Sequence, residues 1–106
     1  MLFLALFLTG SVPAGATLLI NELMASNSGI AQDPQGDYDD WVELYNSADA
    51  PVDVGGMYLT DDMEVPGKWR IPADHSSLTT IPAHGYLILW ADNDTTDAGL
   101  HANFKL

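Results

Sequence analysis

Residues 41–45 read Trp-Val-Glu-Leu-Tyr and residues 85–90 read Gly-Tyr-Leu-Ile-Leu-Trp, and these two stretches decide the fold class. In the first, Val42 and Leu44 alternate with larger or polar residues, which is the period of two of a strand with one face in the core. In the second, both alternating sets are apolar, which predicts a central strand covered on both faces. We therefore predict that residues 86–90 form the centre of the core.

Further short apolar runs recur along the chain between clusters of Gly, Pro, Asn, Asp and Ser. They cover residues 18–24, 57–60, 68–71 and 101–106. This rhythm is typical of an all-β domain, and no window carries the spacing of a long amphipathic helix. We predict an all-β, antiparallel β-sandwich with minimal helix, in which Trp90 and at least one other Trp are buried. The predicted core residues are Ile20, Val42, Leu44, Leu59, Leu87 and Leu89.

Length and composition exclude several classes of function. With 106 residues, the chain forms one domain at most. Its 15 acidic and 3 basic side chains give a formal charge of -12. Nucleic acid and anionic membrane surfaces are bound through Lys and Arg, so we expect neither as a partner. The absence of Cys excludes disulfides, thiolate nucleophiles and metal sites with Cys ligands.

The first residues are typical of an export signal. Residues 2–8 form an unbroken apolar run, and Ala14-Gly15-Ala16 is a small-x-small cleavage site. The run is well below the roughly 20 apolar residues of a membrane-spanning helix. We therefore predict a signal peptide over residues 1–16, a β-sandwich domain over residues 17–106, and a secreted or cell-surface location without membrane insertion once the signal is removed.

Several motifs carry a resemblance to a known family. They are Leu19-Ile20-Asn21-Glu22-Leu23-Met24, Gly36-Asp37-Tyr38-Asp39-Asp40-Trp41-Val42-Glu43-Leu44-Tyr45-Asn46, Lys68-Trp69-Arg70-Ile71-Pro72, Ile81-Pro82-Ala83-His84-Gly85-Tyr86 and Asn103-Phe104-Lys105-Leu106. In order and spacing the chain resembles the lamin tail domain family in its bacterial, secreted form, over residues 18–106. The resemblance implies an immunoglobulin-like β-sandwich, in agreement with the strand pattern.

The resemblance also bears on the end of the chain. In that family, closing strands follow the Phe-Lys-Leu position, which here is residues 104–106. We therefore expect a C-terminally truncated sandwich in which residues 101–106 form a strand with an open edge. Bacterial members are commonly modules of large secreted proteins, sometimes beside a kinase domain resembling spore coat protein H or beside hydrolases. The chain is accordingly expected to be a fragment of such a protein.

An acidic loop precedes the predicted strand at residues 41–45. Asp37, Asp39 and Asp40 offer oxygen ligands within four residues, the donor type that calcium prefers. The loop is not an EF-hand, because Val42 and Ala48 occupy the positions that require Gly and Glu. Two interpretations stay open: an irregular calcium site at these three residues, or carboxylates that cap turns and remain solvated.

For the other acidic residues, a structural role is favoured over a functional one. For Asp92, Asp94 and Asp97, turn capping is favoured over metal binding. Glu22 and Glu43 lie within predicted strands, where a structural role as hydrogen-bond acceptors is favoured over a glycosidase-like pair.

Three histidines and one tyrosine are further candidates for a functional role. His75, His84 and His101 lack the spacing of a helical zinc site and are interpreted as surface or hydrogen-bonded residues. Tyr38, in the acidic loop, is the best candidate for an exposed aromatic side chain.

Taken together, the sequence favours a non-catalytic, exported interaction or adhesion module of a larger secreted or cell-surface protein. Its expected partner is a protein or a cell-surface polymer. The alternatives are a calcium-dependent or carbohydrate-binding β-sandwich module, and an accessory domain of a kinase or hydrolase encoded beyond this fragment. No motif pairs a nucleophile with a base, so we do not expect an enzyme.

Overall fold

The computed structural model describes residues 5–7, 18–24, 29, 31–93 and 99–105, with only the backbone considered for 5–7 and 18–24. Its strands are β1 (Ala5–Phe7), β2 (Leu18–Met24), β3 (Trp41–Asn46), β4 (Val52–Asp53), β5 (Tyr58–Thr60), β6 (Trp69–Arg70), β7 (Thr80–Ile81) and β8 (Tyr86–Trp90). The described residues form one helical turn, α1 (Ser76–Thr79), which cannot span a membrane. The prediction of an all-β fold with minimal helix is confirmed.

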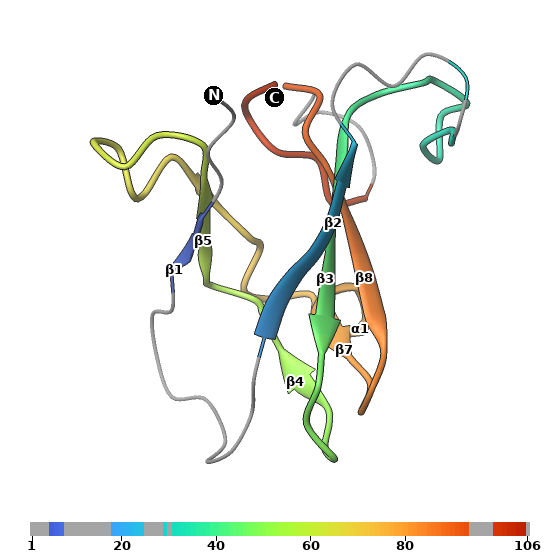
Figure 1. Ribbon diagram of the computed structural model, residues 1–106, viewed down its shortest axis with the longest axis vertical. Coiled ribbons are helices and arrows are strands. Elements are labelled where there is room, and N and C mark those ends of the chain that lie inside the picture. Colours follow the sequence, from blue (N-terminus) through green and yellow to red (C-terminus); the bar gives the residue numbers. More distant parts are fainter. Residues whose placement is uncertain (1–4, 8–17, 25–28, 30, 94–98, 106) are drawn as a thin grey trace.

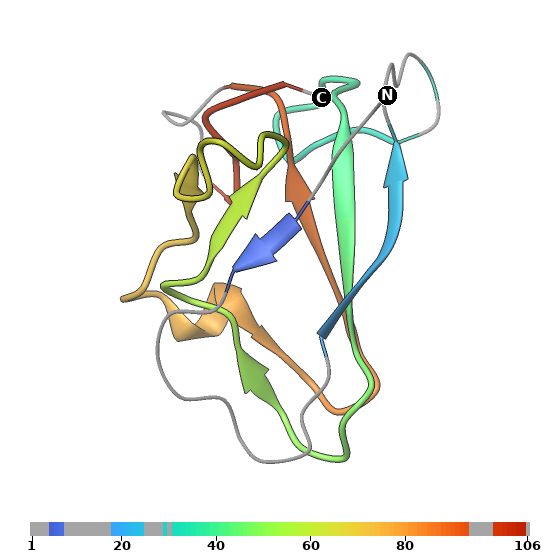
Figure 2. The same ribbon diagram turned by 60° about the vertical axis from the view of Figure 1, so that its left-hand side comes forward.

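The strands form two layers and a short extra ladder. One antiparallel sheet has the order β2-β3-β8, the other has the order β1-β5-β6, and β4 pairs with β7. Figures 1 and 2 show the β1–β5 layer facing the β2–β3–β8 layer, with β4 and α1 at one end. The pairing of β2 with β3 is interrupted by a register shift between Ile20 and Glu22. This is the antiparallel sandwich that the strand pattern predicts.

The core lies between the layers, and β3 supplies its centre. Val42 and Leu44 point inward from β3 and are fully buried, as is Leu89 from β8. Leu59 of β5 and Trp69 of β6 belong to the same apolar cluster from the opposite sheet. The remaining buried members of the cluster are Val52, Val54, Met57, Ile71, Ile81, Ala91, Leu100, Ala102 and Phe104. All three tryptophans are buried, so that prediction is confirmed.

The predicted role of residues 86–90 as a central, doubly covered strand is wrong. β3 is the middle strand of its sheet, and β8 pairs only with β3 in that sheet. Tyr86 and Ile88, on the outer face of β8, are 56% and 37% exposed. Leu87 packs against the core but is only partly buried. The apolar outer face is therefore a surface feature. The side chain of Ile20, another predicted core residue, lies outside the described part of the chain.

The predicted strand over residues 101–106 is also wrong for its described part. Residues 101–105 make two isolated bridges, His101 in parallel with Trp90 and Lys105 antiparallel with Asp92, so the segment reverses direction. Phe104 lies between these bridges and is buried in the core. Its side chain is therefore covered within the described structure, contrary to the open edge expected there. Leu106 lies outside the described residues, and the proposed loss of C-terminal strands stays a prediction.

A buried amide closes one end of the sandwich. Asn46, the last residue of β3, is fully buried. Its Nδ2 donates to the carbonyl oxygens of Ala50, Ile81 and Pro82 at 2.9, 3.1 and 3.1 Å. Its Oδ1 accepts from the backbone N–H of Ala48 at 3.0 Å. One side chain thus connects the turn after β3 to the turn before β8.

Leu44→Ala tests the location of the core. We expect a loss of about 2–5 kcal/mol in the free energy of unfolding, because the substitution opens a cavity among fully buried side chains. Ile88→Ala, on the exposed face of the paired strand, serves as the control and should cost much less. Urea denaturation of the two variants measures both values. Equal losses would contradict the assignment of the inner and outer faces.

Asn46→Asp tests the buried amide. Oδ1 can still accept from Ala48, but the second oxygen would face three carbonyl oxygens, and a buried acceptor without a donor costs about 1–3 kcal/mol. We expect the variant to be strongly destabilised at neutral pH and to recover stability as the pH falls, because protonation restores a donor. Thermal melting across pH, beside the wild type, gives the result. A pH-independent loss would contradict this role of Nδ2.

Candidate functional site

The acidic loop before β3 is organised around Asp33. The Asp33 Oδ1 atom accepts the backbone N–H groups of Gln35 and Asp37, each at 2.9 Å. The Asp33 N–H donates to the Asp37 carbonyl at 2.8 Å, and Gly36 adopts a positive φ of 89° in the turn. These bonds fold residues 33–37 into a tight turn. Asp33 is thus a turn-capping residue of the acidic loop, and it was not one of the three predicted calcium ligands.

The second carboxylate oxygen of Asp33 lacks a partner. Only 6% of the residue's surface is exposed. No hydrogen-bond donor in the described part of the chain reaches Oδ2, which is itself buried. A buried, ionised oxygen without a donor or cation is unfavourable, so Asp33 differs from an ordinary turn-capping aspartate.

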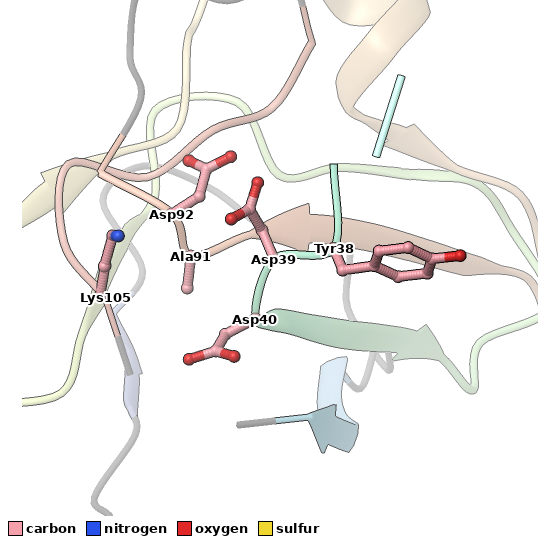
Figure 3. A pocket seen from close by; sticks show the side chains of 6 residues that line it. All are labelled: Tyr38, Asp39, Asp40, Ala91, Asp92 and Lys105. Carbon is pink, nitrogen blue, oxygen red and sulfur yellow. The ribbon is translucent and has the colours of Figure 1, made fainter. Parts of the chain in front are cut away.

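The pairing of β3 with β8 brings a second segment to this loop. Trp41 lies opposite Trp90, and the backbone N–H of Ala91 donates to the Asp40 carbonyl at 2.7 Å. Asp92, which directly follows Ala91, is therefore placed beside Asp39. Figure 3 shows the carboxylates of these two residues on the same side of an open pocket. The pocket has a volume of about 170 Å³ and is lined by Tyr38, Asp39, Asp40, Ala91, Asp92 and Lys105.

Asp40 and Tyr38 are oriented differently. The Asp40 carboxylate extends away from those of Asp39 and Asp92, and the ring of Tyr38 extends away from all three acids (Figure 3). Tyr38 is exposed, as the sequence predicted.

Asp92 is held by a histidine. The Asp92 Oδ2 atom lies 2.5 Å from His101 Nδ1, and both side chains are almost completely buried. A carboxylate can only accept a hydrogen bond, so Nδ1 of His101 carries the hydrogen. The described part of the C-terminal segment thus fixes the orientation of Asp92. His101 is a buried, hydrogen-bonded residue, one of the two interpretations of the sequence.

Two groups of three side chains could hold a cation. In each group, one ligand atom per residue lies within 4.8 Å of the others: Asp33, Asp37 and Asp39 form one group, and Asp33, Asp92 and His101 form the other. The structure therefore brings together Asp37 and Asp39 of the predicted site. It adds Asp33 and Asp92 and leaves Asp40 out of both groups. Asp94 and Asp97 lie outside the described residues.

The clustering affects the acidity of Asp39. Partial burial raises the pKa of its carboxyl above the ordinary value of 3.8, and the negative charges of Asp92, Asp33 and Asp37 raise it further. Lys105 acts in the opposite direction and lowers this pKa. The charged form of Asp39 is thus less favourable in the folded protein than in the unfolded chain.

The two glutamates lie on neighbouring strands. Glu22 and Glu43 are opposite each other in the register of β2 and β3, and Glu43 is half-buried. The side chain of Glu22 lies outside the described part of the structure. No acceptor in that part reaches the buried Nε1 of Trp41.

The fold and the site together define an immunoglobulin-like β-sandwich with an acidic cluster at one end of its sheets. The chain belongs to the lamin tail domain family, whose family model matches residues 11–106. This is a family of non-enzymatic, immunoglobulin-like domains that usually mediate interactions. The match confirms the resemblance to the family. Comparisons with curated proteins and with solved structures gave no match.

Asp39→Asn tests the electrostatics of the cluster. Because the pKa of Asp39 is raised in the folded state, its charge lowers stability above that pKa, and the penalty disappears as the pH falls toward 3.8. In buffer with EDTA, we expect the variant to be more stable than the wild type at pH 7 and to lose this advantage at low pH.

The control is Asp74→Asn, which removes one charge from an exposed position and should change stability within about 0.5 kcal/mol. Chemical denaturation at several pH values gives the comparison. A destabilised Asp39→Asn variant in EDTA would contradict the assigned repulsion.

Proposed function

We propose that this chain is a non-catalytic, exported module that attaches a larger secreted or cell-surface protein to another protein or to a cell-surface polymer. Membership of the lamin tail domain family supports the role in interactions. The apolar run of residues 2–8 and the Ala14-Gly15-Ala16 site support export. The net charge of -12 favours a protein or neutral polymer partner over nucleic acid.

One observation carries the proposal: the outer face of β3 and β8 presents large side chains to solvent. Tyr45 and Tyr86 are cross-strand neighbours whose ring centroids are 4.9 Å apart. Ile88 adjoins them on β8 and is also exposed. Aromatic side chains on a rigid sheet offer a large contact area at low entropic cost, which suits a binding surface.

Polar groups flank this face where β3 ends and β8 begins. His84 Nε2 lies 2.8 Å from Asp49 Oδ1, and His84 Nδ1 lies 3.5 Å from the Tyr45 hydroxyl. Both His84 and Asp49 are well exposed. An apolar centre with hydrogen-bonding groups at its edge is the usual anatomy of a protein interface.

The test combines export and attachment in the source organism. The full chain, carrying a C-terminal tag, should be recovered outside the cytoplasm with a mass that corresponds to loss of residues 1–16. The purified protein should bind to intact cells or isolated envelopes. We expect Tyr86→Ser combined with Ile88→Ser to reduce binding at least tenfold, because the substitutions remove the exposed apolar contacts.

The matched control is Met63→Ser combined with Leu78→Ser, two exposed apolar residues outside strands β3 and β8. This variant should bind as the wild type does. A cytoplasmic, unprocessed protein would refute export. Equal binding by both double variants would refute the assignment of the binding face.

A further inference from the structure

Asp33 stands apart from the other acidic residues of the described chain. It is more than nine-tenths buried, and its Oδ1 atom is occupied by two backbone N–H groups. Turn capping accounts for Oδ1 only. The buried Oδ2 atom has no donor within the described structure, although Asp33 belongs to both groups of converging ligand atoms. A hydrogen-bond donor or a cation would satisfy such an oxygen, and no donor of the described chain is in place.

We propose that Asp33, Asp37 and Asp39 bind a calcium ion at the end of the sandwich, with Asp92 beside them. Calcium would then connect the loop of residues 31–40 to the segment that follows β8. The proposal holds whether or not the module serves in attachment, since it depends only on this cluster.

The type of ligand favours a hard cation. The group offers only carboxylate oxygens, which are ligands for hard cations. Calcium binds oxygen at about 2.3–2.6 Å, so two ligands of one ion can be up to about 4.6–5.2 Å apart. The three ligand atoms of the group all lie within 4.8 Å of one another, so one calcium ion can reach all of them. Magnesium demands near-ideal octahedral geometry and gives up its water ligands reluctantly, which an irregular loop of carboxylates does not favour.

The local charge favours a divalent cation. The negative charges of Asp92, Asp33 and Asp37 all act on the carboxylate of Asp39. Among the three basic residues of the chain, Lys105 alone lines the adjacent pocket. Lys68 is paired with Asp61 at 2.7 Å. Lys105 lowers the pKa of Asp39, whereas the three neighbouring carboxylates raise it.

The second group of ligands is less suitable. Asp33, Asp92 and His101 combine oxygen with imidazole, a set that zinc or another transition metal would prefer. However, His101 Nδ1 already donates to Asp92 Oδ2 at 2.5 Å. A metal bound to that nitrogen would have to break this buried hydrogen bond, so only Nε2 would remain for a metal. The adjacent pocket, which Asp39 and Asp92 line, has a volume of about 170 Å³ and is smaller than the about 300–1,000 Å³ of typical small-molecule sites.

The key variant is Asp33→Asn in the full chain. The asparagine Oδ1 can keep both turn hydrogen bonds, while Nδ2 replaces the oxygen that would bind calcium. We expect the variant to melt at the same temperature as the wild type or higher in EDTA. Calcium at 10 mM should raise the melting temperature of the wild type by several degrees but should not raise that of Asp33→Asn. Magnesium at the same concentration should have little effect on either protein.

A second readout does not depend on stability. Terbium(III) substitutes for calcium, and its luminescence is excited through Trp41 and Trp90, which are each two residues along the chain from an acid of the cluster, Asp39 and Asp92. Calcium should displace terbium with a dissociation constant of about 10⁻⁴–10⁻³ M, the range of extracellular calcium modules. Asp33→Asn should weaken terbium binding at least tenfold. Asp40→Asn and Asp74→Asn remove the same charge outside the proposed ligand set and should weaken it less than threefold.

Three results would overturn the proposal. Equal stabilisation of the wild type by calcium, magnesium and a matched concentration of sodium chloride would indicate charge screening alone. A calcium effect that persists in Asp33→Asn would remove the buried carboxylate from the site. Stabilisation by zinc without any response to calcium would assign the cation to the Asp33, Asp92 and His101 group instead.

Discussion

The antiparallel ladder between β3 and β8 is the constraint on which the rest of this structure depends. It places Trp41 opposite Trp90 and Leu44 opposite Leu87, and thereby directs the inner faces of both strands toward the opposing sheet. A shift by one residue would turn Val42 and Leu44 toward solvent. The same ladder determines what happens beyond its ends. At one end the Asn46 amide connects two turns, and at the other Asp40 and Ala91 continue the pairing through their backbones.

Because the ladder continues past Trp41 and Trp90, residues separated by half of the chain meet at one end of the sheet. Asp39 and Asp92 become neighbours through backbone pairing, and not through attraction between their side chains. The C-terminal segment then fixes Asp92 through His101 and contributes Phe104 to the core. The repulsion between the acids is thus tolerated by a framework that apolar packing stabilises independently. This arrangement separates the elements that maintain the fold from the cluster available for binding.

The sequence predicted the parts of the fold that follow from period and composition. The alternation at residues 41–45 predicted that Val42 and Leu44 share the buried face of their strand, and the breakers excluded long helices. It failed for β8 because an apolar outer face looks the same whether another layer covers it or solvent does. It failed for residues 101–105 because their apolar side chains fill the core from an irregular turn, where no strand period exists. The two-residue strands β4 and β7 are too short to show any period.

For the acidic cluster, sequence reasoning recognised the loop but could not assign its members. Consecutive residues of extended chain point to opposite sides, and this separates the side chain of Asp40 from that of Asp39. Asp33 lies before a proline and gives no local sign of burial. Asp92 could have been found only if residues 41–45 had been paired with residues 86–90, because continuing that ladder beyond its ends places residues 39–40 next to residues 91–92. Its partner His101 could not, because that contact depends on the turn in the C-terminal segment.

Strand β1 lies within the predicted signal peptide of residues 1–16, so it can exist only before that peptide is cleaved. Ala5–Phe7 pairs with β5 in the structure, and the family match begins only at residue 11. Cleavage after Ala16 would remove β1 and leave the other edge of β5 open. The exposed edge would be only three residues long, and short edges are poor templates for pairing with other chains. The described members of the core cluster lie between Val42 and Phe104, and β5 would keep its ladder with β6. A cleaved signal peptide and a permanent strand at residues 5–7 therefore exclude each other in the mature protein.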